Sequence, residues 1–161
     1  MDNLLREART IAISYIGISR KSSGRILAYL KSKGYSRDTS ESVIQQLITD
    51  GYIDDVRIAR SIIASRTVRK TEAKSLLLRR LHQAGISRDA IEIIKEEIPD
   101  DRESILVLVD QKIMPDFRKQ MTLDSFDADV WINKSFRYLV SKGYSSSLSL
   151  DTLRNRIRDV E

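Results

Sequence analysis

The amino-acid sequence predicts an all-α fold built from tandem three-helix repeats. Glycine and proline are scarce, with 6 Gly and 2 Pro in 161 residues, whereas average usage would give about 19 such residues. A protein with many strands needs these residues for its turns. Apolar residues instead recur at steps of three and four, as at Leu5, Ala8 and Ala12, which is the spacing of one helix face. We therefore expect a chain that folds mostly as helices.

A short pattern, Leu-x-x-x-Gly-apolar-Ser, occurs three times, at residues 30–36, 81–87 and 139–145. Glycine accommodates the left-handed conformation that often follows a helix, and serine caps the next helix. The intervals of 51 and 58 residues predict an internal repeat, although three unrelated helix hairpins would show the same pattern. Because such units bury little apolar surface alone, we expect them to stack into an elongated, curved molecule.

Turn signals divide the helical chain into five expected parts. Pro99 disfavours helix at the residue before it and so separates two helices. Pro115 lies in a stretch of mixed polar composition, which predicts a linker or a lengthened loop. In chain order, the expected parts are an N-terminal helix at residues 1–18, the first repeat at 19–66, the second at 67–113, the linker or loop at 114–126 and the third repeat at 127–161.

Few side chains could support catalysis. The chain has no Cys and one histidine, His82, so thiolate chemistry is excluded and a Ser-His-Asp triad lacks a supporting motif. Two aspartate pairs, Asp54-Asp55 and Asp100-Asp101, stand where helices should start, which favours capping over acid–base chemistry. We expect no enzyme activity, no cofactor and no metal. The absence of Cys and of a long apolar run predicts a cytoplasmic protein without a membrane span.

Positive charge is concentrated in residues 57–80. The chain carries 28 Lys and Arg against 23 Asp and Glu, and this segment has eight basic residues with Glu72 as its one acid. Residues 20–37 add six basic residues and no acid. A solvated helix face usually mixes the two signs, so this segregation indicates a surface for a polyanion or an acidic protein. The segment 57–80 has no aromatic residue for base stacking, which disfavours autonomous binding of single strands.

These basic segments supply the candidate contact residues. Arg66 falls on the apolar side of its helix, so it either contacts the partner or pairs with a carboxylate within the fold. The candidates for contact with protein or DNA are Arg57, Arg60, Arg66, Arg69, Lys70, Lys74, Arg79, Arg80, Arg20, Lys21 and Arg25.

A set of motifs extends over residues 15–160, and its most specific part is Gly-Tyr-Ile-Asp-Asp-x-Arg at residues 51–57. The others are Arg20-Lys-Ser-Ser with Ile26, Leu27 and Leu30, then Gly34-Tyr35, Ala59, Arg66, Leu81 through Gly85-Ile86, and Phe136 through Gly143-Tyr144. Together they resemble the RecX family of bacterial recombination regulators. The resemblance implies tandem three-helix repeats without catalytic residues. It also implies that the protein lodges in the groove of the RecA filament on DNA and inhibits strand exchange, ATP hydrolysis and coprotease activity.

The sequence departs from this family in two places. Family members often have Gly or Pro where this chain has Lys70-Thr71-Glu72, and Thr71 can cap the helix that follows. The stretch 114–126 is also unusual, which puts the angle between the second and third repeats in doubt.

The leading hypothesis is a RecX-like regulatory protein of homologous recombination, DNA repair and the SOS response. It would act as a monomer that inhibits the RecA filament and contacts DNA phosphates within it. One alternative is a DNA-binding protein with tandem helix-turn-helix-like units. The helices expected after Ser36, Ser87 and Ser145 carry few Arg, Asn or Gln to read bases, which disfavours it. The other alternative is a helical-repeat scaffold for an acidic partner.

Overall fold

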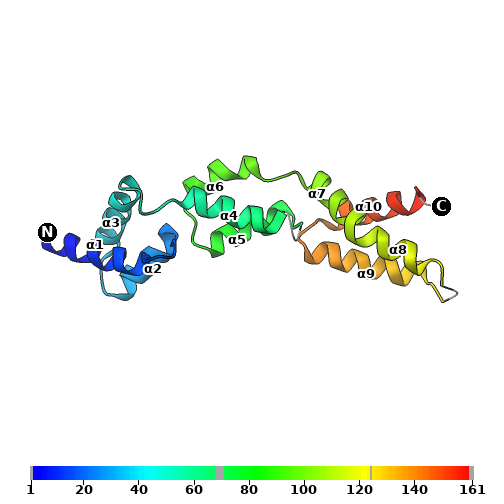
Figure 1. Ribbon diagram of the computed structural model, residues 1–161, viewed down its shortest axis with the longest axis horizontal. Coiled ribbons are helices and arrows are strands. Elements are labelled where there is room, and N and C mark those ends of the chain that lie inside the picture. The colour runs from blue at the N-terminus through cyan, green and yellow to red at the C-terminus, as the bar shows by residue number, and fades with distance from the viewer. Residues whose placement is uncertain (1, 68–70, 124, 160–161) are drawn as a thin grey trace. The chain divides into compact units, whose positions relative to one another are not determined.

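The computed structural model describes residues 2–67, 71–123 and 125–159, and these residues form helices and connecting turns without β-strand (Figure 1). The predicted all-α class is confirmed. In chain order the elements are α1 (Asp2–Ile16), α2 (Ser23–Ser32), α3 (Arg37–Thr49), α4 (Asp55–Thr67), α5 (Lys74–Gln83), α6 (Arg88–Ile94), the 3-10 turn η1 (Lys95–Glu97), α7 (Asp101–Leu108), the π-helical η2 (Val109–Ile113), α8 (Met114–Gln120), α9 (Ala128–Ser141) and α10 (Ser146–Arg158).

The repeated turn has the predicted conformation in all three copies. Each glycine has a positive φ, of 90°, 75° and 93° in chain order, and each serine side chain accepts a hydrogen bond from a backbone N–H in the first turn of the next helix. The three copies are Gly34 with Ser36, Gly85 with Ser87, and Gly143 with Ser145. The residue after each glycine donates its N–H back to the carbonyl of the pattern's leucine, so the turn ends one helix and begins the next.

The chain divides into two compact units, Met1–Ile62 with Arg79–Glu97 and Ile63–Leu78 with Ile98–Glu161. The division falls within α4 and within α5, so each of these helices contributes one end to each unit. The expected stacking of all three repeats into an elongated, curved molecule concerns the arrangement of the units and stays a prediction, as do the repeat boundaries.

The core of the first unit is formed by α1, α2 and α3. Ala8 and Ala12 on α1 are fully buried together with Ile26, Leu30 and Leu47. The small side chains of the alanines allow α1 to pack closely on its neighbours. The N-terminal helix expected at residues 1–18 is thus an integral part of this core.

The second unit has an aromatic centre, and it includes the stretch expected to be a linker. Residues 114–120 form α8, which follows η2 directly, so the helical backbone runs without a break from Asp101 to Gln120. Pro115 is tolerated in this run because it stands just after the π-helical turn, where the regular α-helical hydrogen-bond pattern is already interrupted. Met114 and Phe117 are buried, and the Phe117 and Trp131 rings lie 4.7 Å apart between centroids. The helix therefore belongs to the packed core, and turns follow it before α9.

Candidate binding surface

The start of α2 lies against the turn that ends α5, within the first unit. The Ser22 hydroxyl donates to the Ala84 carbonyl at 2.6 Å, and the Gly24 N–H donates to the Gly85 carbonyl at 2.9 Å. A Cβ on Gly24 would lie 2.6 Å from that carbonyl oxygen, which leaves no room for a side chain. This contact joins the basic segment 20–25 to the end of α5.

The same contact recurs in the second unit, between the start of α5 and the turn that ends α9. The Ala73 N–H donates to the Lys142 carbonyl at 2.9 Å, and the Ser75 hydroxyl donates to the Gly143 carbonyl at 3.0 Å. A Cβ on Gly143 would lie 2.8 Å from the Leu76 Cβ. In addition to adopting the left-handed conformation, the glycine of this turn therefore permits close approach of another helix start, that of α2 at Gly85 and that of α5 at Gly143.

The first aspartate of each pair caps its own helix, as predicted. Asp54 accepts from the Arg57 N–H at 2.9 Å at the start of α4, and Asp100 accepts from the Arg102 N–H at 2.7 Å at the start of α7. These bonds satisfy backbone donors that a helix leaves free in its first turn.

The second aspartate of each pair holds a distant helix. Asp55 is buried and accepts hydrogen bonds from the Ser23 N–H and hydroxyl and from the Ser87 N–H. Asp101 accepts from the Lys74 N–H at 2.7 Å, at the start of α5. The expectation that Thr71 caps α5 is corrected, because Thr71 lies before the helix with a φ of 47°.

The structure assigns the candidate basic residues to both units. Those in the first unit are Arg20, Lys21, Arg25, Arg57, Arg60, Arg79 and Arg80, and those in the second are Arg66 and Lys74. Arg69 and Lys70 lie outside the described residues. The contact between the start of α2 and the end of α5 brings together the segments 20–25 and 79–85 of the first unit.

Arg60, Arg66 and Lys21 each have a partner among the residues that the structure describes. Arg60 donates to Glu97 from Nε at 2.9 Å and from Nη2 at 2.7 Å, and these hydrogen bonds lower the pKa of Glu97. Arg66 Nη1 lies 3.7 Å from Glu72 Oε1. Lys21 Nζ lies 5.4 Å from the centroid of the Tyr15 ring, a cation–π distance. Because these three side chains already interact within the fold, they are less available for contact with a partner than an unpaired Lys or Arg.

Four candidates are exposed and make no side-chain ion pair with any residue that the structure describes. They are Arg20, Arg25, Arg57 and Arg79, all in the first unit. Guanidinium groups in this state can form bidentate hydrogen bonds with phosphate or carboxylate.

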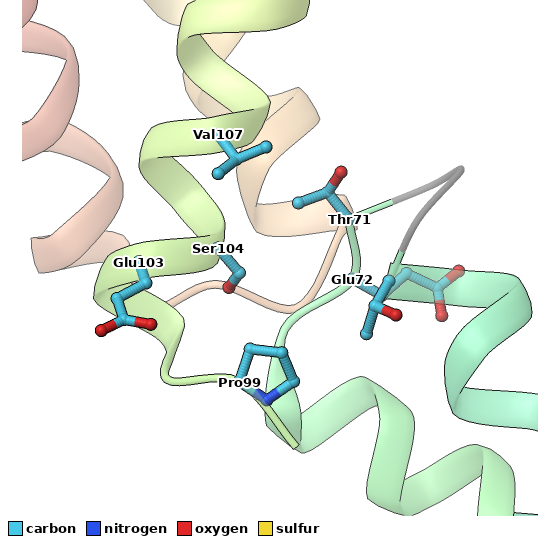
Figure 2. Close-up of a pocket in the computed structure, with 7 residues that line it drawn as sticks. Thr71, Glu72, Pro99, Glu103, Ser104 and Val107 are labelled. Atoms are coloured by element: carbon cyan, nitrogen blue, oxygen red, sulfur yellow. The ribbon is translucent and has the colours of Figure 1, made fainter. Parts of the chain in front are cut away.

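Glu72 is one of the residues that line a pocket of about 200 Å³ in the second unit (Figure 2). Figure 2 shows Thr71 and Glu72 on the segment that precedes α5, with Thr71 facing Ser104 and Val107 of α7 and the Glu72 carboxylate directed away from α7. The Glu72 side chain is only 2% exposed, so the charge of Arg66 compensates a buried carboxylate. This supports the alternative in which Arg66 acts within the fold.

The acidic partners of Arg60 and Arg66 differ in how far the sequence indicates them. Glu72 carried a signal, because it is the one acid in a strongly basic segment. Glu97 carried none, because it lies 37 residues from Arg60. Within the described ranges, no three His or carboxylate side chains cluster in a way that could hold a metal ion.

In the part of the chain that the structure describes, no helix has both the length and the apolar character needed to cross a membrane.

Comparison with known proteins gives consistent names. No family model matches the chain. Regulatory protein RecX of Prosthecochloris aestuarii is 31% identical over 152 residues, which cover 94% of this chain and 95% of that protein. Regulatory protein RecX of Leuconostoc citreum is 26% identical over 145 residues, which cover 89% of this chain and 52% of that protein. The crystal structure of RecX from Lactobacillus salivarius has a similar fold, with a TM-score of 0.67, 16% identity, and coverage of 96% of this chain and 97% of that chain.

Proposed function

The chain belongs to the family of RecX regulatory proteins, and from this membership we propose that it binds the RecA filament on DNA and inhibits its ATP hydrolysis, strand exchange and coprotease activity. Binding inhibits only if it discriminates between filament states, because equal affinity for all states would shift no equilibrium. The protein therefore favours filament states that are inactive or prone to disassembly.

One observation carries the assignment of the contact surface. The contact between the start of α2 and the turn after α5 brings the exposed Arg25 close to the end of α5, and α5 also carries the exposed Arg79. Two basic segments that are distant in sequence thereby meet in one unit. Such a surface supports contact with phosphates or with acidic groups of the filament, and it makes association fast and sensitive to salt.

The test is a titration of the protein into RecA assembled on single-stranded DNA, with ATP hydrolysis as the readout. We expect inhibition at substoichiometric or equal protein. Arg25→Glu with Arg79→Glu should weaken inhibition by about tenfold or more, because each reversal replaces an attraction by a repulsion. Helical circular dichroism should stay unchanged, since both side chains are exposed.

The matched control has the same change of charge elsewhere. Arg154→Glu with Arg158→Glu alters two exposed arginines of α10 in the second unit and should leave inhibition close to that of the parent protein. Equal loss in both double variants would assign the effect to net charge alone. No inhibition by the parent protein would refute the proposed function, and sequence-selective binding to duplex DNA alone would favour the helix-turn-helix alternative.

A further inference from the structure

A groove of about 490 Å³ in the first unit lies where the end of α3, the start of α4 and α6 meet. Its volume falls within the range of about 300–1,000 Å³ that is typical of ligand sites. Ile48 of α3 and Ile93 of α6 line it and are 42% and 57% exposed. Two large aliphatic side chains from different repeats are thus open to solvent in the same depression.

The groove is acidic on a chain whose net charge is +5. Its eleven lining residues, all described by the structure, include three aspartates and no lysine or arginine. The Asp55 carboxylate is buried and engaged by Ser23 and Ser87. The accessible negative charge therefore belongs to Asp54 and Asp89, which are exposed.

The hydrogen bonds of Asp55 also hold the groove in shape. This residue begins α4, and it accepts from the Ser87 N–H at the start of α6 at 2.7 Å. Because the two helix starts are bound to each other, α6 and its Ile93 keep their place beside α4. A preformed groove loses little conformational entropy when it is filled.

We propose that this groove binds a basic peptide segment of a partner protein. Aliphatic side chains of the segment pack on Ile48 and Ile93, and its Lys or Arg side chains approach Asp54 and Asp89. Phosphate and nucleic acid are disfavoured there, because the aspartates repel them. A second copy of the chain is disfavoured by repulsion between two molecules that each carry a net charge of +5. The proposal does not depend on binding to RecA.

The test uses the full chain and a fluorescein-labelled synthetic peptide of alternating Lys and Leu, followed by fluorescence anisotropy. We expect saturable binding. The double variant Ile48→Ser, Ile93→Ser should raise Kd about tenfold or more, because it removes apolar contact area, and Asp89→Lys should raise Kd by a similar factor. The matched control Leu106→Ser, Val140→Ser alters two aliphatic side chains that are each 40% exposed in the second unit and should leave Kd unchanged.

Two altered peptides separate charge from apolar contact. A peptide with Glu in place of Lys, and one with Ser in place of Leu, should each bind at least about tenfold more weakly. Equal binding of either one would overturn the proposal, as would the absence of saturable binding by the Lys-Leu peptide. Sedimentation velocity tests whether a second copy of the chain occupies the groove instead. Self-association that disappears in the Ile48→Ser, Ile93→Ser variant would show that a second copy fills the groove, and it would also overturn the proposal. No RecA is present in these assays, so their outcome is independent of the ATPase test.

Discussion

The carboxylate of Asp101 accepts a hydrogen bond from the backbone N–H of Lys74 at 2.7 Å. Asp55 accepts the equivalent bond from the backbone N–H of Ser23 at 2.9 Å in the first unit. In both cases an aspartate at the start of one helix, α4 or α7, satisfies a free backbone donor at the start of an earlier helix, α2 or α5. The Asp-Asp pair thus has two structural functions, since its first member caps one helix and its second member fixes another.

Replacement of Asp55 by alanine should destabilise the first unit strongly. The change leaves the Ser23 N–H and hydroxyl and the Ser87 N–H without their acceptor, and an unsatisfied buried donor costs about 1–3 kcal/mol. We expect the free energy of unfolding to fall by about 3 kcal/mol in urea denaturation. Asp54→Ala removes one cap bond and should cost about 1 kcal/mol. Equal losses in the two variants would contradict the second function assigned to the pair.

Alanine at Gly143 should destabilise the protein more than alanine at Gly34. Both glycines have a φ near 90°, so both substitutions carry the cost of a left-handed residue, about 1–2 kcal/mol. At Gly34 the new Cβ meets no atom within 4 Å, whereas at Gly143 it would lie 2.8 Å from the Leu76 Cβ. We expect Gly143→Ala to lower the free energy of unfolding by about 1–3 kcal/mol more than Gly34→Ala does.

The difference between these two variants isolates the close approach of α5 to the turn that ends α9, because the backbone strain is common to both. It can be measured as the difference in urea midpoint at a common denaturant slope. Indistinguishable midpoints would mean that α5 shifts away from the turn of α9 at little cost.

Arg66→Ala should reduce stability, in contrast to Arg57→Ala on the same helix. Arg66 lies 3.7 Å from the nearly inaccessible carboxylate of Glu72, so its loss leaves that charge with less compensation. We expect a loss of about 1–3 kcal/mol by thermal or urea unfolding. Arg57 is exposed, and its truncation should change stability by no more than about 0.5 kcal/mol. If Arg66→Ala unfolds with the same stability as the parent protein, contact of Arg66 with a partner would be favoured instead.

Local features of the fold were predictable from the sequence, and long-range features were not. Gly85 and Ser87 lie within one seven-residue pattern, so the end of α5 and the cap of α6 could be predicted from their own neighbourhood. The bond from Lys74 to Asp101 spans 27 residues, and no local signal encodes it. Pro115 is a loop signal in the sequence, but it lies within helix here because the π-helical turn η2 directly before α8 already interrupts the regular hydrogen-bond pattern.

The same distinction between local and long-range information applies to the candidate binding residues. Charge counting located the basic segments, but it could not separate Arg60, whose guanidinium is held by Glu97, from the exposed Arg79. That distinction depends on tertiary pairing between residues that are remote in sequence.

Tyr144→Phe should lower stability below pH 10, and its effect should diminish in alkali. The buried Tyr144 hydroxyl donates to the Thr71 carbonyl and also lies 3.1 Å from the Ser104 hydroxyl. Loss of these bonds should cost about 1–2 kcal/mol in urea denaturation near neutral pH. Phe136→Leu, a change at a half-buried aromatic residue of α9 without a titratable group, is a control whose cost should not depend on pH.

Burial raises the pKa of Tyr144 from its ordinary value of 10.0 to about 12, so the folded protein holds this proton more tightly than the unfolded chain. The resulting stabilisation is complete below pH 10 and is lost as the pH rises from 10 towards about 12. Phenylalanine has no such proton, so the gap in stability between the parent protein and Tyr144→Phe should narrow over this interval. A gap that stays constant from neutral pH to about pH 11 would show that the Tyr144 hydroxyl titrates in the folded protein as it does in the unfolded chain.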